Sequence, residues 1–348
     1  GALNVGGSIL DGSGTSTINL ENTAAANSLS STDITVDNFN INPTDPGANA
    51  VTYTRTGGTL TVNNKLVLGG SPNAGTDDAG NLTQNGGTVI IQGDLLFGGT
   101  TGADTEGGTY NFNGGTLNIT GNIVEGAGIG SPDSGIDTAQ FYINTDTDGG
   151  PASLSIGGDV IVQSFRVGDS ADGSYTTTGG QSITTTGTLL VGRAAEGTLT
   201  LDGGTHSANN LTVSDAGASA GSVLTLQNGA SLSVRSTAST ALDVGDANNS
   251  DGTININGGS TLTSQGRIDL GQAGSAHGEI NVNNGTLHAR RGLYIAGDGT
   301  NDGSTTGDVT VGANGIVNVA AVNTNTEVGR GGTGTLTING GTFNQLGA

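Results

Sequence analysis

A short acidic stretch, Y-I-N-T-D-T-D-G-G at residues 142–150, has residue types and a spacing that could bind a metal ion. Asn144, Asp146 and Asp148 alternate with other residues before Gly149, and Ca²⁺ prefers oxygen ligands of this kind. The last ligand position of an EF-hand loop would be Ser155 instead of Glu, which excludes that motif. Two interpretations stay open: a Ca²⁺ site of another type, and Asx turns in a solvated loop, which are the commoner use of such residues.

Fragments of two hydrolase chemistries also occur, but their arrangement does not suit catalysis. Pectin hydrolases with a β-helical fold carry N-T-D, D-D, G-H-G and R-I-K in that order, whereas here D-D at 77–78 precedes N-T-D at 144–146. His206, His277 and His288 are not accompanied by a G-x-S-x-G turn that would present a nucleophilic serine. No pair of carboxylates stands out as an acid and a base. We therefore expect no catalytic residues. A polysaccharide-active β-helix enzyme is kept as the second alternative for the function of the chain.

The amino-acid composition limits the kinds of site and of partner that the chain can have. Of 348 residues 66 are Gly, aromatic residues make up 3%, and Cys, Met and Trp are absent, so neither disulfides nor thiolate metal sites exist. The net charge is −21, with only 9 Lys and Arg. Because nucleic acid and anionic membrane surfaces need a basic footprint, neither is an expected partner. No apolar run approaches the ~18 residues of a membrane span.

A repeated phrase organises the sequence, and G-T-L-T-I-N-G-G-T near the C-terminus is its clearest copy. The repeats are roughly 22 to 30 residues long, the length of one solenoid coil. Each has a first strand, a glycine doublet as a corner, a second strand, a third strand of the form L-x-V-G, and a variable polar loop. The doublets begin at Gly57, Gly86, Gly114, Gly157, Gly179, Gly203, Gly258 and Gly340, with Asn-Gly versions at Asn228, Asn284 and Asn314.

The strands alternate apolar and polar residues, which places every second side chain on one face. T-V-N-N at 61–64 and S-L-S-I at 153–156 are assigned as first strands. No apolar stripe with a helical period persists for two turns. The pattern predicts an all-β protein, a parallel β-helix (β-solenoid) with about three short strands per coil and roughly 11 to 12 coils. Asparagines that precede the doublets should stack into a hydrogen-bonded ladder; they are Asn85, Asn113, Asn257 and Asn339.

The solenoid is not uniform along the chain. Residues 1–50 are less regular, and we interpret them as an N-terminal strand and a first coil. Residues 51–348 carry the repeats, with a loop insertion expected near residues 126–150, where the interval between doublets is longer.

The phrase G-T-L-T-I-N-G-G-T followed by L-x-V-G resembles the autotransporter-associated β-strand repeats of bacterial surface proteins. It is also similar to repeats in exported bacterial proteins of the PEP-CTERM type. The resemblance covers about residues 51–348 and implies a secreted bacterial β-helical protein, extracellular or at the cell surface. It is specific for architecture and says little about activity.

An even spread of repeats without a concentrated site favours a structural protein. The sequence ends on a first and a second strand, while G-A-L-N-V-G-G at residues 1–7 has the form of a third strand. Joining the two ends of identical chains would complete one repeat by strand augmentation. We therefore expect an extracellular filament subunit that assembles head to tail with itself, with Leu3, Val5, Phe343 and Leu346 at the joint. A cell-surface adhesin or stalk is the alternative.

Overall fold

A computed structural model describes residues 8–20, 27–28, 33–41, 51–69, 79–98, 107–125, 139–144, 153–217, 221–238, 240–297, 304–320 and 325–346. The named elements among these residues are β-strands, and they pair in parallel. The prediction of an all-β parallel solenoid is confirmed. The chain forms two compact units, Gly1–Phe165 and Arg166–Ala348.

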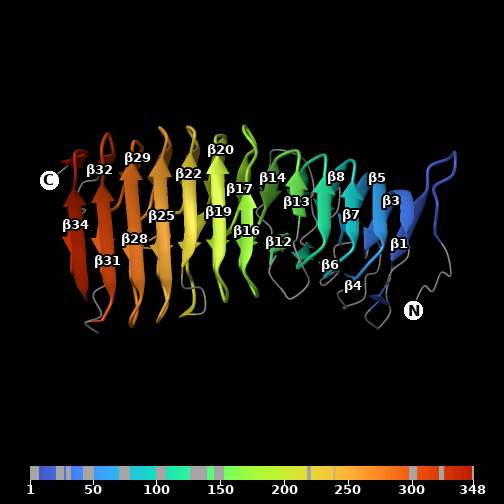
Figure 1. The fold of residues 1–348 in the computed structure, drawn as a ribbon, viewed down its shortest axis with the longest axis horizontal. Coiled ribbons are helices and arrows are strands. Elements are labelled where there is room, and N and C mark those ends of the chain that lie inside the picture. Colours follow the sequence, from blue (N-terminus) through green and yellow to red (C-terminus); the bar gives the residue numbers. More distant parts are fainter. Residues whose placement is uncertain are drawn as a thin grey trace. The chain divides into compact units, whose positions relative to one another are not determined.

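In the first unit each coil passes through three rows of parallel strands (Figure 1). The first row contains β2 (Asn27–Ser28), β4 (Val51–Arg55), β6 (Gly80–Gln84), β9 (Gly108–Phe112) and β12 (Gln140–Ile143). The second row contains β7 (Thr88–Ile91), β10 (Thr116–Ile119) and β13 (Ser153–Ile156), and the third contains β8 (Asp94–Phe97), β11 (Ile123–Glu125) and β14 (Val160–Val162). Strand β15 (Ser164–Val167) contains the boundary between the units.

The first coils of this unit do not yet separate the second and third rows. Strand β5 (Thr59–Leu68) pairs with β7 along its first half and with β8 along its second half. It also pairs with β3 (Ile34–Ile41), which in turn pairs with β1 (Thr17–Leu20). The described strands before residue 51 thus belong to the same unit as the repeats up to residue 165.

The second unit also has three rows of parallel strands, and their numbers apply within that unit only. The first row contains β16 (Gly173–Thr176), β19 (Gly197–Asp202), β22 (Ser222–Gln227), β25 (Asp251–Asn257), β28 (His277–Asn283), β31 (Thr306–Val311) and β34 (Thr333–Ile338). The second contains β17 (Ile183–Thr185), β20 (Thr205–Ala208), β23 (Ser231–Val234), β26 (Thr261–Ser264), β29 (Thr286–Ala289), β32 (Ile316–Ala320) and β35 (Thr342–Leu346). The third contains β18 (Thr188–Val191), β21 (Asn210–Val213), β24 (Leu242–Val244), β27 (Ile268–Leu270), β30 (Leu293–Ile295) and β33 (Thr326–Val328).

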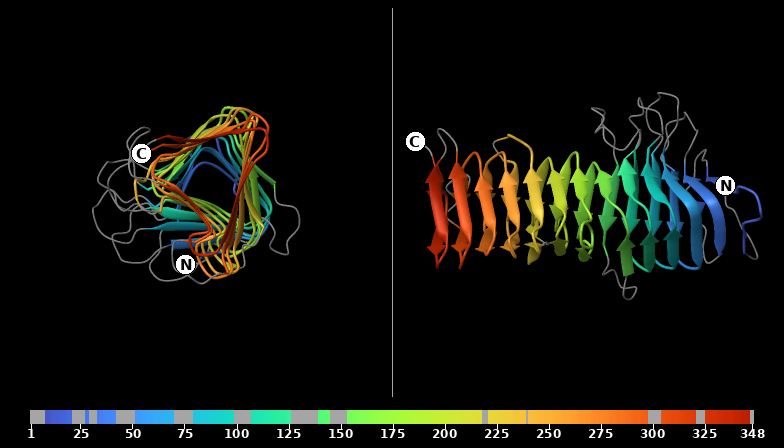
Figure 2. Two further views of the ribbon diagram at one scale, coloured as in Figure 1. Left: turned by 90° about the vertical axis from the view of Figure 1, so that its left-hand side faces the viewer. Right: turned by 90° about the horizontal axis from the view of Figure 1, so that it is seen from above.

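Alternation along each strand builds the core. In β25 every second residue is buried, and Ile254 pairs in register with Leu224 on one side and Ile280 on the other. All three side chains are fully buried. Equivalent apolar residues therefore stack from coil to coil inside a three-sided wall, which Figure 2 shows for the second unit in yellow to red. Burial of this continuous apolar column is the main stabilising term of such a fold.

One part of the predicted repeat register is wrong. S-L-S-I at 153–156 is β13, which pairs with β10 and so lies in the second row instead of the first. Gly157 and Gly158 accordingly stack on the next corner, where their amide groups donate to the carbonyls of Ile119 and Gly121. T-V-N-N at 61–64 likewise lies within β5, and the first strand of that coil is β4. Alternation alone could not distinguish the rows, because each row alternates in the same way.

The segment expected as an inserted loop contains a strand. Gln140–Ile143 form β12 and pair in register with β9, from Thr109 to Phe112. Residues 126–138 and 145–150 lie outside the described residues.

Candidate assembly site

The last described coil of the second unit presents three open strand edges. Within the described residues, β33, β34 and β35 each pair with one neighbour, namely β30, β31 and β32. An unpaired edge carries a row of free backbone N–H and C=O groups, which is a template for another strand.

Apolar side chains lie along these edges. Val328, Ile338 and Leu346 are 47%, 53% and 53% exposed. Two of these residues have covered counterparts one coil earlier: Ile295, which pairs with Val328, and Val311, which pairs with Ile338, are both fully buried. The same interior columns thus continue into the last described coil.

The edges carry few of the features that normally prevent strand pairing. Natural proteins protect edges with charges, prolines or bulges. The sequences of β34 and β35, T-G-T-L-T-I and T-F-N-Q-L, contain no charged residue and no proline. In β33 the one charge, Glu327, is neutralised by Arg330, whose Nε lies 3.2 Å from the Glu327 carboxylate.

Two of the four residues predicted at the joint lie among the described residues. Phe343 is half-buried and Leu346 exposed, both on β35. Leu3 and Val5 lie outside the described residues. In the first unit Leu10 is 76% exposed, and within the described residues β1 pairs with β3 alone.

Of the three residues predicted to bind Ca²⁺, only Asn144 lies among the described residues. Asn144 is 1% exposed, and its Nδ2 donates to Asn113 Oδ1 at 3.1 Å. Asn113 Nδ2 donates in turn to Asn85 Oδ1 at 2.9 Å. Asn144 therefore extends the ladder predicted for Asn85 and Asn113, while Asp146 and Asp148 lie outside the described residues. Among the described side chains, no three His, Asp or Glu converge as a metal ion would require.

The three histidines have different surroundings. His206 is buried; its Nδ1 accepts the Ile183 N–H at 3.1 Å, and its Nε2 lies 2.8 Å from the Gly203 carbonyl. His288 lies on the outer face of β29, with Nδ1 3.4 Å from Asn318 Nδ2. His277 lies between two aspartates. These contacts of the three rings are with backbone, amide and carboxylate groups.

A carboxylate cluster on the third row was not found from the sequence. Asp243 and Asp269 occupy the middle positions of β24 and β27 and are register partners. Arg267 Nε donates to Asp269 Oδ2 at 2.7 Å. Burial, with the nearby charges of Asp246 and Asp269, raises the pKa of Asp243 to about 8. The sequence contains a signal for this cluster in L-D-V at residues 242–244 and I-D-L at residues 268–270. The residue between the two apolar positions of a third strand must stack on the equivalent residue of the next coil.

Comparison with known proteins gives no further information. No family model matches the chain, and neither a curated protein nor a solved structure matches it. The described part of the chain contains no helix with the length and apolar character of a membrane span.

Proposed function

We propose that the chain is a structural, non-catalytic subunit of an extracellular filament, in which copies associate end to end by pairing their open coil edges. The observation that carries this proposal is the apolar, uncharged edge formed by β34 and β35, with Ile338 and Leu346 exposed. An apolar strand edge without charges or proline favours strand addition by a segment of matching pattern.

The chain itself contains such a segment. In the register of the repeats, L-N-V-G at residues 3–6 would follow β35 as a third strand and add to β33, in the place where L-L-V-G at residues 189–192 follows β17 and L-D-V-G at residues 242–245 follows β23. Ile9 and Leu10 would then add to β34, and β1 would add to β35. Each added strand is parallel, as in the rest of both units. Such a contact uses different surfaces on the two copies, so it need not close and can extend into an open polymer.

The remaining surface supports a structural role. In the described residues, polar chemistry is distributed as ladders that repeat from coil to coil, such as Asn85, Asn113 and Asn144, or Asn318 and Asn344. The location outside the cell rests on the resemblance of the repeats to those of exported bacterial proteins. Ca²⁺ binding by Asn144, Asp146 and Asp148 remains an expectation of the sequence.

Sedimentation velocity and negative-stain microscopy of the purified chain test this function. The wild type should form assemblies whose length grows with concentration. Ile338→Lys places a charge on the open edge and should abolish growth without unfolding the unit, because Ile338 is already half-exposed. Thr337→Lys is the matched control: it adds the same charge on the outer side of the strand, where Thr337 pairs with Thr310, and so leaves the apolar column intact and should assemble normally.

Two outcomes would contradict the proposal. Wild-type chains that stay monomeric at high concentration would exclude end-to-end assembly and favour a stalk or adhesin. Release of reducing ends from a panel of polysaccharides would contradict the non-catalytic assignment and favour an enzyme of the β-helix type.

A further inference from the structure

His277 connects three successive coils of the second unit. It begins β28, and its register partners are Asp251 on β25 and Thr306 on β31. Its Nδ1 lies 2.9 Å from Asp251 Oδ1, and its Nε2 lies 3.1 Å from Asp308 Oδ2. Both ring nitrogens therefore face carboxylate oxygens at hydrogen-bond distance, on opposite sides of the strand.

This geometry selects one form of the ring. A neutral imidazole has one N–H donor and one lone-pair acceptor, so it can donate to only one of two carboxylates. The imidazolium carries two N–H donors and can donate to both. Hydrogen bonds between ionised partners are also stronger than neutral ones. We propose that His277 is a proton-dependent bridge that ties β25, β28 and β31 together as an imidazolium and releases them when it is deprotonated.

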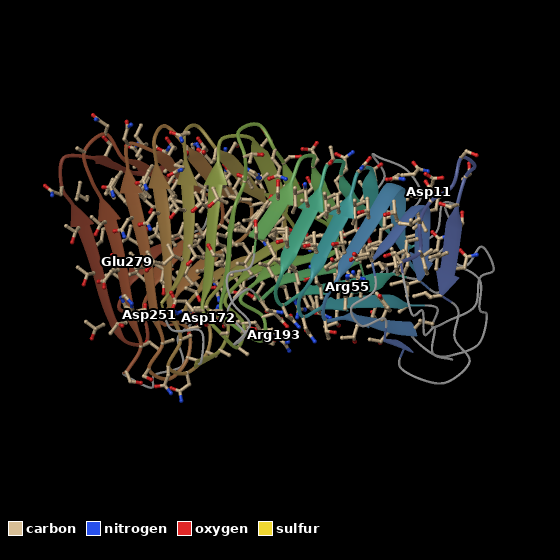
Figure 3. The ribbon with its side chains drawn as sticks, turned by 45° about the vertical axis from the view of Figure 1, so that its right-hand side comes forward. Asp11, Arg55, Asp172, Arg193, Asp251 and Glu279 are labelled. Atoms are coloured by element: carbon tan, nitrogen blue, oxygen red, sulfur yellow. The ribbon has the colours of Figure 1, made fainter. Side chains whose placement is uncertain are left out.

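The charges around the bridge favour the protonated ring. Asp251 faces it from β25, Asp308 faces it from β31, and Glu279 lies two residues along on β28 itself. Glu279 Oε2 accepts a hydrogen bond from Thr253 Oγ1 at 3.5 Å. Figure 3 shows Asp251 and Glu279 on the outer side of the solenoid wall. Without the imidazolium, three carboxylates on neighbouring coils would repel one another with no cation among these facing groups.

Burial and the two aspartates act in opposite directions on this ring. Partial burial lowers the pKa of His277. The hydrogen bonds and charges of Asp251 and Asp308 together raise it by more than burial lowers it, so the net result is a pKa above the usual 6.5. Because the folded-state pKa is raised, the bridge stabilises the fold fully below the unfolded pKa of ~6.5. That stabilisation is lost as the pH rises through the folded-state pKa.

His288 provides a matched control in the same sequence. It also lies on the outer face of a strand, but burial and the neighbouring Arg290 lower its pKa. A general effect of alkaline pH on surface histidines would therefore involve both residues, whereas the bridge involves His277 alone.

Titration of the ring nitrogens and carbons by NMR tests the protonation state directly. At about pH 6.5 both nitrogens of His277 should show imidazolium shifts, and its midpoint should lie above that of His288. Asp251→Asn and Asp308→Asn should each lower the His277 midpoint, because each removes one facing carboxylate. A His277 ring that is neutral at that pH, or a midpoint that neither substitution changes, would overturn the proposal.

Unfolding measured against pH tests the bridge as a device of the fold. Between about pH 6 and pH 9 the wild type should lose stability, and the amide protection factors in β25, β28 and β31, which correct for base-catalysed exchange, should fall. His277→Gln should remove that part of the pH dependence, and His288→Gln should retain it. An unchanged pH dependence in His277→Gln would contradict the bridge. If this variant does not fold, the midpoint shift in Asp308→Asn decides the question.

Discussion

In the second unit, the residue after each third-row strand has a left-handed backbone conformation even where it is not glycine. Gly245, Gly271 and Ala296 occupy this position in successive coils, with φ of 69°, 61° and 67°. At Gly271 an added Cβ would overlap the carbonyl oxygen of Thr306. Glycine at 271 is therefore required by space as well as by φ, whereas position 296 accommodates a methyl group that is fully buried.

Exchanging these side chains should give unequal results. Gly271→Ala combines positive-φ strain with a backbone overlap and should cost at least about 2 kcal/mol of unfolding free energy. Ala296→Gly relieves strain but loses a buried methyl and adds chain entropy, so its effect should stay within about 1 kcal/mol. Urea unfolding of both variants measures the difference. Equal losses would show that space does not distinguish the two corners.

The half-buried carboxyl of Asp243 should make alkaline conditions unfavourable for the fold. Burial, Asp246 and Asp269 raise its pKa from 3.8 to about 8, so the folded state retains a proton that the unfolded state releases. The stabilisation from the protonated form is present below the unfolded pKa and is lost progressively up to about pH 8.

Asp243→Asn should therefore match the wild type near pH 4 and exceed it at about pH 8, where a gain of about 1 kcal/mol raises Tm by ~2–4 °C. Thermal melts at the two pH values measure this difference. A constant offset at all pH values would contradict the ionisation argument.

At the scale of the element, each strand has two faces that behave differently. In β26, Leu262 is fully buried and its register partners are Leu232 and Leu287, while Thr263 faces outward between Ser233 and His288. The interior position is in contact with apolar residues from both neighbouring coils. The outer position is in contact with polar side chains and water.

Truncation should distinguish these faces. Leu262→Ala leaves a cavity in the apolar column and should cost about 2–5 kcal/mol. Thr263→Ala, one residue away, should change stability by less than about 1 kcal/mol. Because each coil contacts mainly its neighbours, the loss should also raise amide exchange in β23 and β29. Similar losses for the two variants would contradict the assignment of the interior face.

The repeat pattern predicted where strands lie and which face of each strand is buried. It did not predict the row of every strand or the side-chain clusters that form between coils. Leu242 and Val244 are interior positions in any register that keeps L-x-V-G together. The row of S-L-S-I at 153–156 depends on which earlier strand it pairs with, and that is a long-range contact. The bridge of His277 depends on Asp308, 31 residues away. Such pairs become visible only when the coil lengths, set by variable loops, are known.

At the scale of the whole molecule, electrostatic repulsion between copies opposes the strand pairing that the proposed assembly requires. Copies with a net charge of −21 repel one another, whereas the proposed joint consists of backbone hydrogen bonds and apolar side chains.

Raising ionic strength from ~0.01 to ~0.15 M shortens the screening length from about 30 to 8 Å and should promote assembly. Light scattering against salt concentration measures this dependence. Assemblies that dissolve as salt is added would show that ion pairs, not the apolar edge, hold the joint.

Cross-linking at the proposed joint tests the central claim most directly. The chain has no cysteine, so an introduced pair reports without background. In the register of L-x-V-G, Asn4 of one copy would lie beside Glu327 of the next, at a separation of about 5 Å that suits a disulfide. Asn4→Cys combined with Glu327→Cys should form a ladder of covalent oligomers on oxidation. Asn4→Cys combined with Thr335→Cys, on the neighbouring strand, should give far fewer. Equal cross-linking of the two pairs, or none of either, would contradict the end-to-end joint.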